Sequence, residues 1–238
     1  EDRNLIGYLD GLASFTYDDI REFYHKWYRP DYQTVVVVGD IDVDKVEQKI
    51  KTIMADIPAP AADAAKKDVI VVPDNDEPIV SVNADPEMQQ SNLMIFYKSQ
   101  AMPKEMNNTM TYELLNIVKS YISNIMSERL SDISRKPNAP FIHAGFSPAG
   151  SFGICPTLEV SVGQVMTQEG KIVEGYKALL TEMERMRRFG FTEGEWERAK
   201  NNMLSSIESK YNSRDDREHA EFAEACIANF REGTPLYD

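Results

Sequence analysis

The chain has 238 residues, of which 39 are acidic and 26 basic, so its formal net charge is −13, and 42% of the residues are hydrophobic. Such an acidic chain, with no sustained run of lysine or arginine, does not fit a protein that binds nucleic acid through clustered positive charge. No stretch approaches the roughly 20 consecutive apolar residues that a membrane span needs, so we expect a globular protein with a sizeable core and no membrane span.

The first third of the chain predicts two helices and a strand. We expect an extended lead-in over residues 1–14 and then a helix that begins near Thr16. The β-branched run Thr34–Gly39 predicts a strand that is covered on both faces. Asp42 can cap a following helix that ends near Ile57. The apolar positions of the first helix, spaced three or four apart, are Ile20, Phe23, Tyr24 and Trp27.

The next segment predicts a linker followed by strands. Residues 58–68 are rich in proline and alanine, which break a helix and bury little, so we interpret them as a linker inside a single domain over residues 1–238. Val69–Val72, Ile79–Asn83 and Leu93–Tyr97 have strand composition. The residues Asp85-Pro86-Glu87 favour a turn, so we expect the last two strands to form a hairpin.

The remainder predicts a long helix, two strands and three helices. The expected ranges are Met106–Ile133, Phe141–Phe146, Thr157–Val162, a helix from Ile172 that is ended by Gly190, a helix from Thr192 to about Lys210, and a final helix that Ser213 caps. Thr192 and Glu195 have the spacing of a capping box. This order predicts an α+β fold, with a largely antiparallel sheet and helices packed on one of its faces.

The search for a metal or catalytic centre in the sequence is largely negative. No two of the three histidines are four residues apart, and neither HExxH nor HxxEH occurs. We interpret His25 and His219 as structural or surface residues. His143, in a predicted strand, is a candidate for a cleft. The two cysteines, Cys155 and Cys226, have no CxxC spacing and are interpreted as buried thiols.

The sequence also lacks the common motifs of nucleophilic catalysis and nucleotide binding. There is no Gly-x-Ser-x-Gly elbow, no GxGxxG and no GxxxxGK[ST]. We interpret the carboxylates on the Thr192 helix as solvated: Glu193, Glu195 and Glu197. Asp74, Asp76 and Glu77 could form an acidic metal-binding loop, but they lack the spacing and the glycine of an EF-hand, so a solvated turn is favoured. The residues predict a domain without a reaction of its own.

Several motifs nevertheless resemble a known family. Residues 23–33 (FYHKWYRPDYQ), followed by VVVVGDID over residues 35–42, resemble the start of the second domain of insulinase/pitrilysin zinc metallopeptidases. Residues 127–130 (SERL) are similar to the family's S-x-R-L, and residues 190–195 (GFTEGE) to its G-[FV]-T-x-x-E. The resemblance covers about residues 15–230 in the right order and is strongest to bacterial multi-domain members.

The resemblance implies a fold, a metal and partners. The fold would be similar to the metallohydrolase domain of mitochondrial processing peptidase. In this family, homologous α+β domains close around a peptide, and one of them binds zinc through HxxEH. The resemblance therefore implies a non-catalytic domain with no cofactor of its own, zinc in the full-length or partner protein, and an HxxEH-bearing domain in the same polypeptide or a partner chain. Peptides or unfolded proteins would be its substrates, so whether this chain should be called an enzyme stays open.

The predicted role is to form part of the peptide chamber. The last domain of active family members carries a substrate-binding arginine on the strand that corresponds to residues 157–162, and no arginine is present here. This departure favours the second domain. Aromatic side chains near strand ends, with His143, are the candidates for lining the chamber: Tyr97, His143, Phe146 and Phe152. The alternative is a zinc-free structural or interaction subunit that partners an active peptidase.

The compartment is not determined by the sequence. Bacterial relatives are often exported, so the resemblance implies the periplasm or the cell surface. The chain starts at Glu1 and has no basic region followed by an apolar region, so we expect a processed chain or a fragment.

Overall fold

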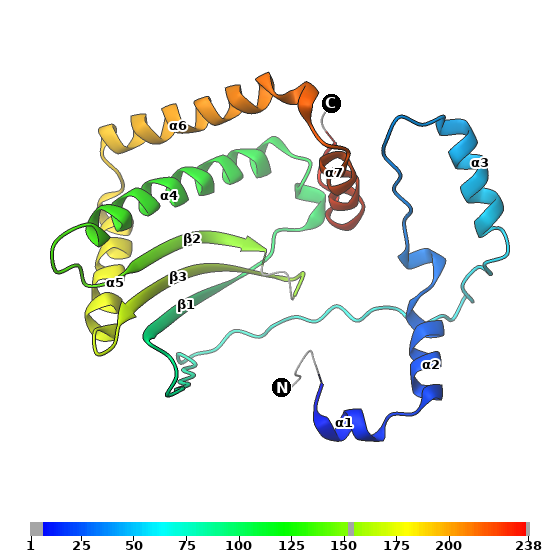
Figure 1. The fold of residues 1–238 in the computed structure, drawn as a ribbon, viewed down its shortest axis with the longest axis horizontal. Coiled ribbons are helices and arrows are strands. Elements are labelled where there is room, and N and C mark those ends of the chain that lie inside the picture. The colour runs from blue at the N-terminus through cyan, green and yellow to red at the C-terminus, as the bar shows by residue number, and fades with distance from the viewer. Residues whose placement is uncertain (1–6, 152–154, 237–238) are drawn as a thin grey trace. The chain divides into compact units, whose positions relative to one another are not determined.

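The computed structural model describes residues 7–151 and 155–236. Contacts divide the chain into two compact units: Glu1–Asp68 with Glu218–Arg231, and Val69–Arg217 with Glu232–Asp238. Figure 1 shows the elements in chain order. Each unit is described by itself, and the single domain over residues 1–238 stays a prediction.

The larger unit is built on a three-stranded antiparallel sheet. Its strands are β1 (Gln90–Gln100), β2 (His143–Ser151) and β3 (Leu158–Gln168), in the order β1-β3-β2. Each overlaps a strand that the sequence predicts. β2 begins later than the predicted strand Phe141–Phe146 and extends beyond its predicted end. Its register with β3 shifts between Ser147 and Gly150, where a bulge accommodates Pro148.

Two helices cover one face of this sheet. They are α4 (Met110–Ser134) and α5 (Ile172–Phe189). The main core cluster joins both helices to β2 and β3, which confirms the predicted α+β fold with an antiparallel sheet and helices on one face. The buried members of this cluster are Met126, Leu130, Phe141, Ala144, Val165 and Leu179.

A further helix, α6 (Glu193–Asn212), lies against α4. The predicted cap at Gly190 is confirmed: its φ is +66° and its N–H donates to the Met186 carbonyl at 2.8 Å. Ser213 does not cap the final helix as predicted. Its hydroxyl donates to the Ser209 carbonyl at 3.0 Å, so it closes α6, and α7 (His219–Glu232) begins six residues later.

The smaller unit contains α1 (Leu9–Ser14), α2 (Tyr17–Trp27), α3 (Val43–Met54) and α7. α1 occupies part of the segment that we expected to be an extended lead-in. The predicted starts of the next two helices are confirmed, since Thr16 forms a capping box with Asp19, and Asp42 accepts from the Lys45 N–H at 3.1 Å. None of the described residues of α1, α2 and α3 is buried.

Three predicted strands are not formed within the described chain. Thr34–Gly39, Val69–Val72 and Ile79–Asn83 lie outside every helix and strand that the structure assigns. The turn of the predicted hairpin is present, with the Met88 N–H donating to the Asp85 carbonyl at 3.1 Å, but only β1 follows it as a strand. Residue composition indicates which segments favour an extended conformation. A β-strand also needs a neighbouring strand at hydrogen-bonding distance.

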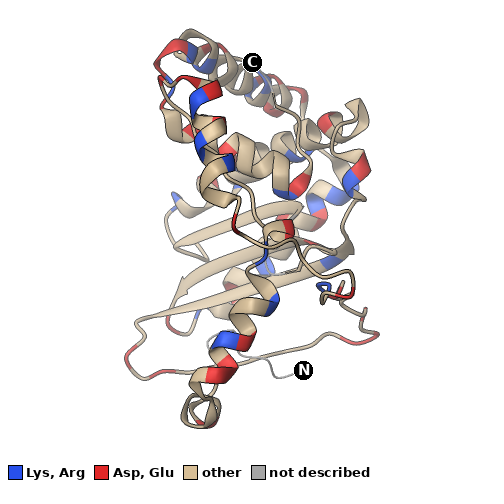
Figure 2. Cartoon of the chain, turned by 90° about the vertical axis from the view of Figure 1, so that its right-hand side faces the viewer, with Lys and Arg blue, Asp and Glu red and all other residues tan. Residues whose placement is uncertain are grey.

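Charged residues are concentrated outside the sheet. Figure 2 shows Lys, Arg, Asp and Glu mainly on helices and loops, while the strands are largely uncharged. Over residues 7–151 and 155–236, no helix is both long and apolar enough to cross a bilayer.

Candidate functional site

The strand register places the candidate chamber residues on different faces of the sheet. Successive side chains of a strand point to opposite faces. Phe146 pairs with Gly163, which pairs with Ile95, and both Phe146 and Ile95 pack against the main core cluster. Phe146 is therefore part of the helix-covered core rather than of an open wall. Tyr97 is two residues after Ile95 and therefore points to the same face of the sheet. It lies nearer the end of β1, however, and is half exposed.

His143 lies on the opposite face, which we call the open face. It is exposed and pairs with Met166, which in turn pairs with Asn92. Met94 and Phe96 follow Asn92 at every second position of β1, so they also point to the open face, and they are 53% and 46% exposed. The open face thus presents an imidazole, a thioether and an aromatic ring, which suits contact with an apolar or extended chain.

The other end of the open face is closed. Residues 70–73 lie against it, since the Thr157 hydroxyl donates to the Ile70 carbonyl at 2.6 Å and the Lys98 ammonium donates to the Pro73 carbonyl at 2.8 Å. A second buried cluster occupies this end: Cys155, Leu158 and Val160. The interpretation of the cysteines as buried thiols is confirmed for Cys155, whereas Cys226 is only partly buried.

The described residues do not fit a zinc site. Among them, no group of three or more His, Cys, Asp and Glu side chains converges where a metal ion could be held. Around the acidic loop, the Asn75 N–H donates to the Asp74 carboxylate at 2.9 Å and the Asn75 amide to the Glu77 carbonyl at 2.6 Å, which is the geometry of a turn. Phe152, the fourth chamber candidate, lies outside the described residues.

A partly buried ion pair joins the two short motifs on α4 and α6. The Arg129 guanidinium donates to the Glu195 carboxylate through both Nε and Nη2, the latter at 2.8 Å, and Nη2 also donates to the Gly190 carbonyl at 3.1 Å. The Phe191 ring lies 5.0 Å from the guanidinium carbon. Both side chains are nearly nine-tenths buried. This arrangement links the start of α6 to the C-terminal part of α4.

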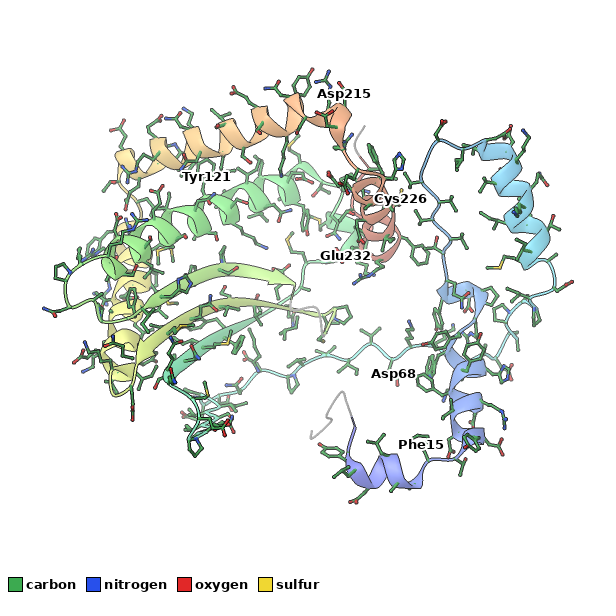
Figure 3. All side chains as sticks on the ribbon, in the orientation of Figure 1. Phe15, Asp68, Tyr121, Asp215, Cys226 and Glu232 are labelled. Carbon is green, nitrogen blue, oxygen red and sulfur yellow. The ribbon has the colours of Figure 1, made fainter. Side chains whose placement is uncertain are left out.

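The capping box orients the Glu195 carboxylate within this ion pair. Its Oε2 accepts from the Thr192 N–H at 2.8 Å and from the Thr192 hydroxyl at 2.9 Å, in addition to Arg129. The Arg129 guanidinium, followed by the bonds from Thr192, lowers the pKa of Glu195 to about 2. The next residue of α6, Trp196, stacks on Tyr121 of α4, with ring centroids 4.1 Å apart. Tyr121 is labelled in Figure 3.

The interpretation of Glu195 as a solvated carboxylate is therefore wrong. Glu193 and Glu197 are exposed, but Glu195 turns back toward the helix start and meets a residue 66 positions earlier. Glu195 closes a capping box in one of the two short motifs, and Arg129 is the basic residue of the other motif, SERL. These two facts together are the signal that could have found the pair.

Acid is expected to lower the stability of the larger unit, because it protonates the Glu195 carboxylate. The pKa of Glu195 is about 2 in the folded chain against an ordinary value of 4.5, so its stabilising contribution is present above about pH 4.5 and is lost as the pH falls toward 2. We expect the urea midpoint of the wild type to fall toward that of Glu195→Gln over this range. Equal acid sensitivity of the two proteins would contradict the role of the ion pair.

Comparisons with known proteins agree with this fold. A family model described as the peptidase M16 inactive domain matches residues 14–203. The chain is 23% identical over 235 residues to the probable zinc protease PqqL of Escherichia coli, a match that covers 99% of this chain and 24% of that protein. The chain thus spans about a quarter of the length of this relative.

Solved structures show the same fold. The crystal structure of the periplasmic protease PqqL from Escherichia coli matches with a TM-score of 0.76 and 20% identity, over 100% of this chain and 25% of that one. The crystal structure of the first half of the same protease also gives 0.76, at 19% identity, over 100% of this chain and 49% of that one. Since the family model covers most of the chain, these 238 residues belong to the peptidase M16 family, as its inactive domain.

Proposed function

We propose that this chain is the non-catalytic domain of a zinc-dependent endopeptidase and that it forms part of the wall of the peptide chamber. The observation that carries the proposal is the match of residues 14–203 to the inactive domain of peptidase M16. In this proposal, zinc and the water-activating glutamate belong to an HxxEH-bearing domain of the same polypeptide or of a partner chain. The bond-breaking chemistry takes place there.

The open face is the surface that we assign to the chamber wall. Met94, Phe96 and His143 project from it, and the sheet behind them is held rigid by the core under α4 and α5. Such a surface offers apolar contact along an extended peptide and one imidazole that can donate or accept a hydrogen bond. Its contribution is to position the peptide and exclude water, which supports catalysis elsewhere.

The proposed compartment is the periplasm. It rests on the similarity to the Escherichia coli protease PqqL, whose crystal structure is described as that of a periplasmic protein. A zinc-free subunit that partners an active peptidase is the alternative, and it is an outcome of the tests below.

The test places a negative charge on the apolar open face. We expect Met94→Glu in the full-length protease to raise KM for an unstructured apolar peptide by about tenfold and to change kcat by less than about twofold, because the buried surface serves binding rather than bond breaking. The matched control is Met110→Glu, since Met110 is 74% exposed at the start of α4, the helix that covers the other face of the sheet. Steady-state kinetics with both variants provide the measurement.

Two results would count against the chamber wall. If Met94→Glu and Met110→Glu have the same KM, the open face does not contact the peptide. If the full-length protein has no peptidase activity with zinc supplied, the alternative of a structural subunit replaces the proposal.

A further inference from the structure

The three-stranded sheet carries very few full charges. Charged residues make up 27% of the whole chain. In the described strands β1, β2 and β3, however, Lys98 and Glu159 are the only Lys, Arg, Asp or Glu residues. Figure 2 shows the strands mainly in tan, while the helices and loops carry both signs of charge. The sheet therefore differs in character from the rest of this acidic chain.

Neither of these two charges lies on the exposed part of the open face. Glu159 lies on the helix-covered face, where its carboxylate pairs with the Lys119 ammonium of α4 at 3.1 Å. Lys98 lies at the closed end of the open face, where its ammonium donates to the Pro73 carbonyl. The exposed part, which runs from Asn92 to Phe96 on β1 and across the paired positions of β3 and β2, holds no Lys, Arg, Asp or Glu within these described strands.

Neutral amides take the place of charges on this part of the sheet. Gln164 of β3 lies between Gly145 of β2 and Met94 of β1. A Cβ at Gly145 would lie 3.2 Å from the Gln164 Nε2, so the glutamine side chain lies over the glycine. Asn92, two residues before Met94, projects from the same face, and both amide residues are exposed. An amide both donates and accepts hydrogen bonds, so these two side chains can bind a peptide main chain without a formal charge.

An uncharged surface of this kind discriminates between peptide side chains. A charged side chain that docks on it loses water without gaining a counter-charge, which costs free energy for either sign. An apolar or amide side chain loses less hydration and gains contact. At 3.4 Å per residue, the surface from Asn92 to Phe96 is about 14 Å long, which an extended peptide covers with about five residues.

We infer that the open face selects a stretch of about five uncharged residues of the peptide substrate, bound in an extended conformation. The inference rests on the proposed function and names the class of peptide that the chamber wall accepts. The match between a surface without full charges and a segment without full charges supports it. The net charge of −13 lies elsewhere on the chain, so it affects the approach of a peptide rather than its fit to this surface.

A charge scan of an unstructured peptide tests the inference. One Lys or one Glu is placed at successive positions of a fluorescent peptide of Ala, Gln, Met and Ser. Fluorescence anisotropy then gives Kd for the zinc-depleted full-length protease at 1 M salt, where the Debye length is about 3 Å. We expect one window of about five positions in which both substitutions raise Kd by about tenfold. The absence of such a window, or effects of opposite sign for Lys and Glu, would overturn the inference.

An isosteric charge on the open face tests whether this surface causes the window. Asn92→Asp and, separately, Gln164→Glu should lower Kd for the Lys peptides of the window by about threefold and raise it for the Glu peptides. The two positions lie on different strands, so either variant alone suffices. The matched control is Asn201→Asp at an exposed position of α6, which adds the same charge and should change neither value. If all three variants behave alike, the open face does not contact the peptide and the inference is wrong.

Peptidase activity after zinc is restored separates the inference from the proposed function. The expected window in a protein that cleaves nothing supports the selective open face and contradicts the peptidase function. Cleavage by a protein without the window supports the proposed function and contradicts the selective open face.

Discussion

Glu195→Gln is expected to lower the free energy of unfolding of the larger unit by about 3 kcal/mol, because it leaves the Arg129 guanidinium partly buried without a counter-charge. Urea unfolding followed by the fluorescence of Trp196 measures this loss. A Trp27→Phe background removes the only other tryptophan, which lies in the smaller unit. Trp196 stacks on Tyr121 beside the ion pair, so it reports the packing of α6 on α4.

Glu184→Gln is the matched control for this prediction. The pKa of Glu184 is also lowered to about 2, by hydrogen bonds from Arg187 and Arg188, but its side chain is 41% exposed on α5. Solvent screens such a surface cluster, so we expect Glu184→Gln to lower the free energy of unfolding far less than Glu195→Gln does. If the two glutamine variants are equally stable, burial of the Arg129–Glu195 pair is not what makes it important.

Gly175→Ala is expected to destabilise the larger unit by about 2 kcal/mol, even though alanine favours a helix over glycine by about 1 kcal/mol. A Cβ at this position of α5 would lie 2.5 Å from the Thr167 Cγ2, 3.1 Å from the Val165 Cγ2 and 3.2 Å from the Pro140 carbonyl oxygen. Thr167 is fully buried on β3, so α5 would have to move away from the sheet. The same urea experiment measures the loss.

Gly194→Ala on α6 separates crowding from helix propensity. The nearest atom to its added Cβ is the Arg198 Nη1, at 3.5 Å, which is an ordinary contact with a flexible side chain. We expect this variant to be as stable as the wild type or more stable by up to about 1 kcal/mol. A Gly175→Ala protein as stable as Gly194→Ala would show that α5 does not need its close approach to β3.

Local sequence signals predicted helices and caps well, because the interacting groups lie within one turn. The helix start at Thr16, the capping box at Thr192 and the C-cap at Gly190 are of this kind. Ser213 was misassigned because a serine between two helices can bond to either one, and here it bonds backward to α6. Local spacing does not decide between these alternatives.

Features that depend on distant residues were not predictable in this way. Glu195 has the spacing of a solvated position, yet its orientation depends on Arg129, which is 66 residues earlier. Thr34–Gly39 has the composition of a covered strand, but what covers it is not in the described chain. Among the chamber candidates, alternation along β2 separates His143 from Phe146, and that separation required the register with β3.

The central claim, that this chain supplies a non-catalytic domain to a zinc protease, is tested most directly by zinc content and peptidase activity on an unstructured peptide. Both are measured on the 238-residue chain alone and on the chain with an HxxEH-bearing domain, joined in one polypeptide or mixed. We expect the chain alone to retain no stoichiometric zinc and to cleave nothing, and the combination to bind zinc and cleave. Stoichiometric zinc and cleavage by the chain alone would contradict the account.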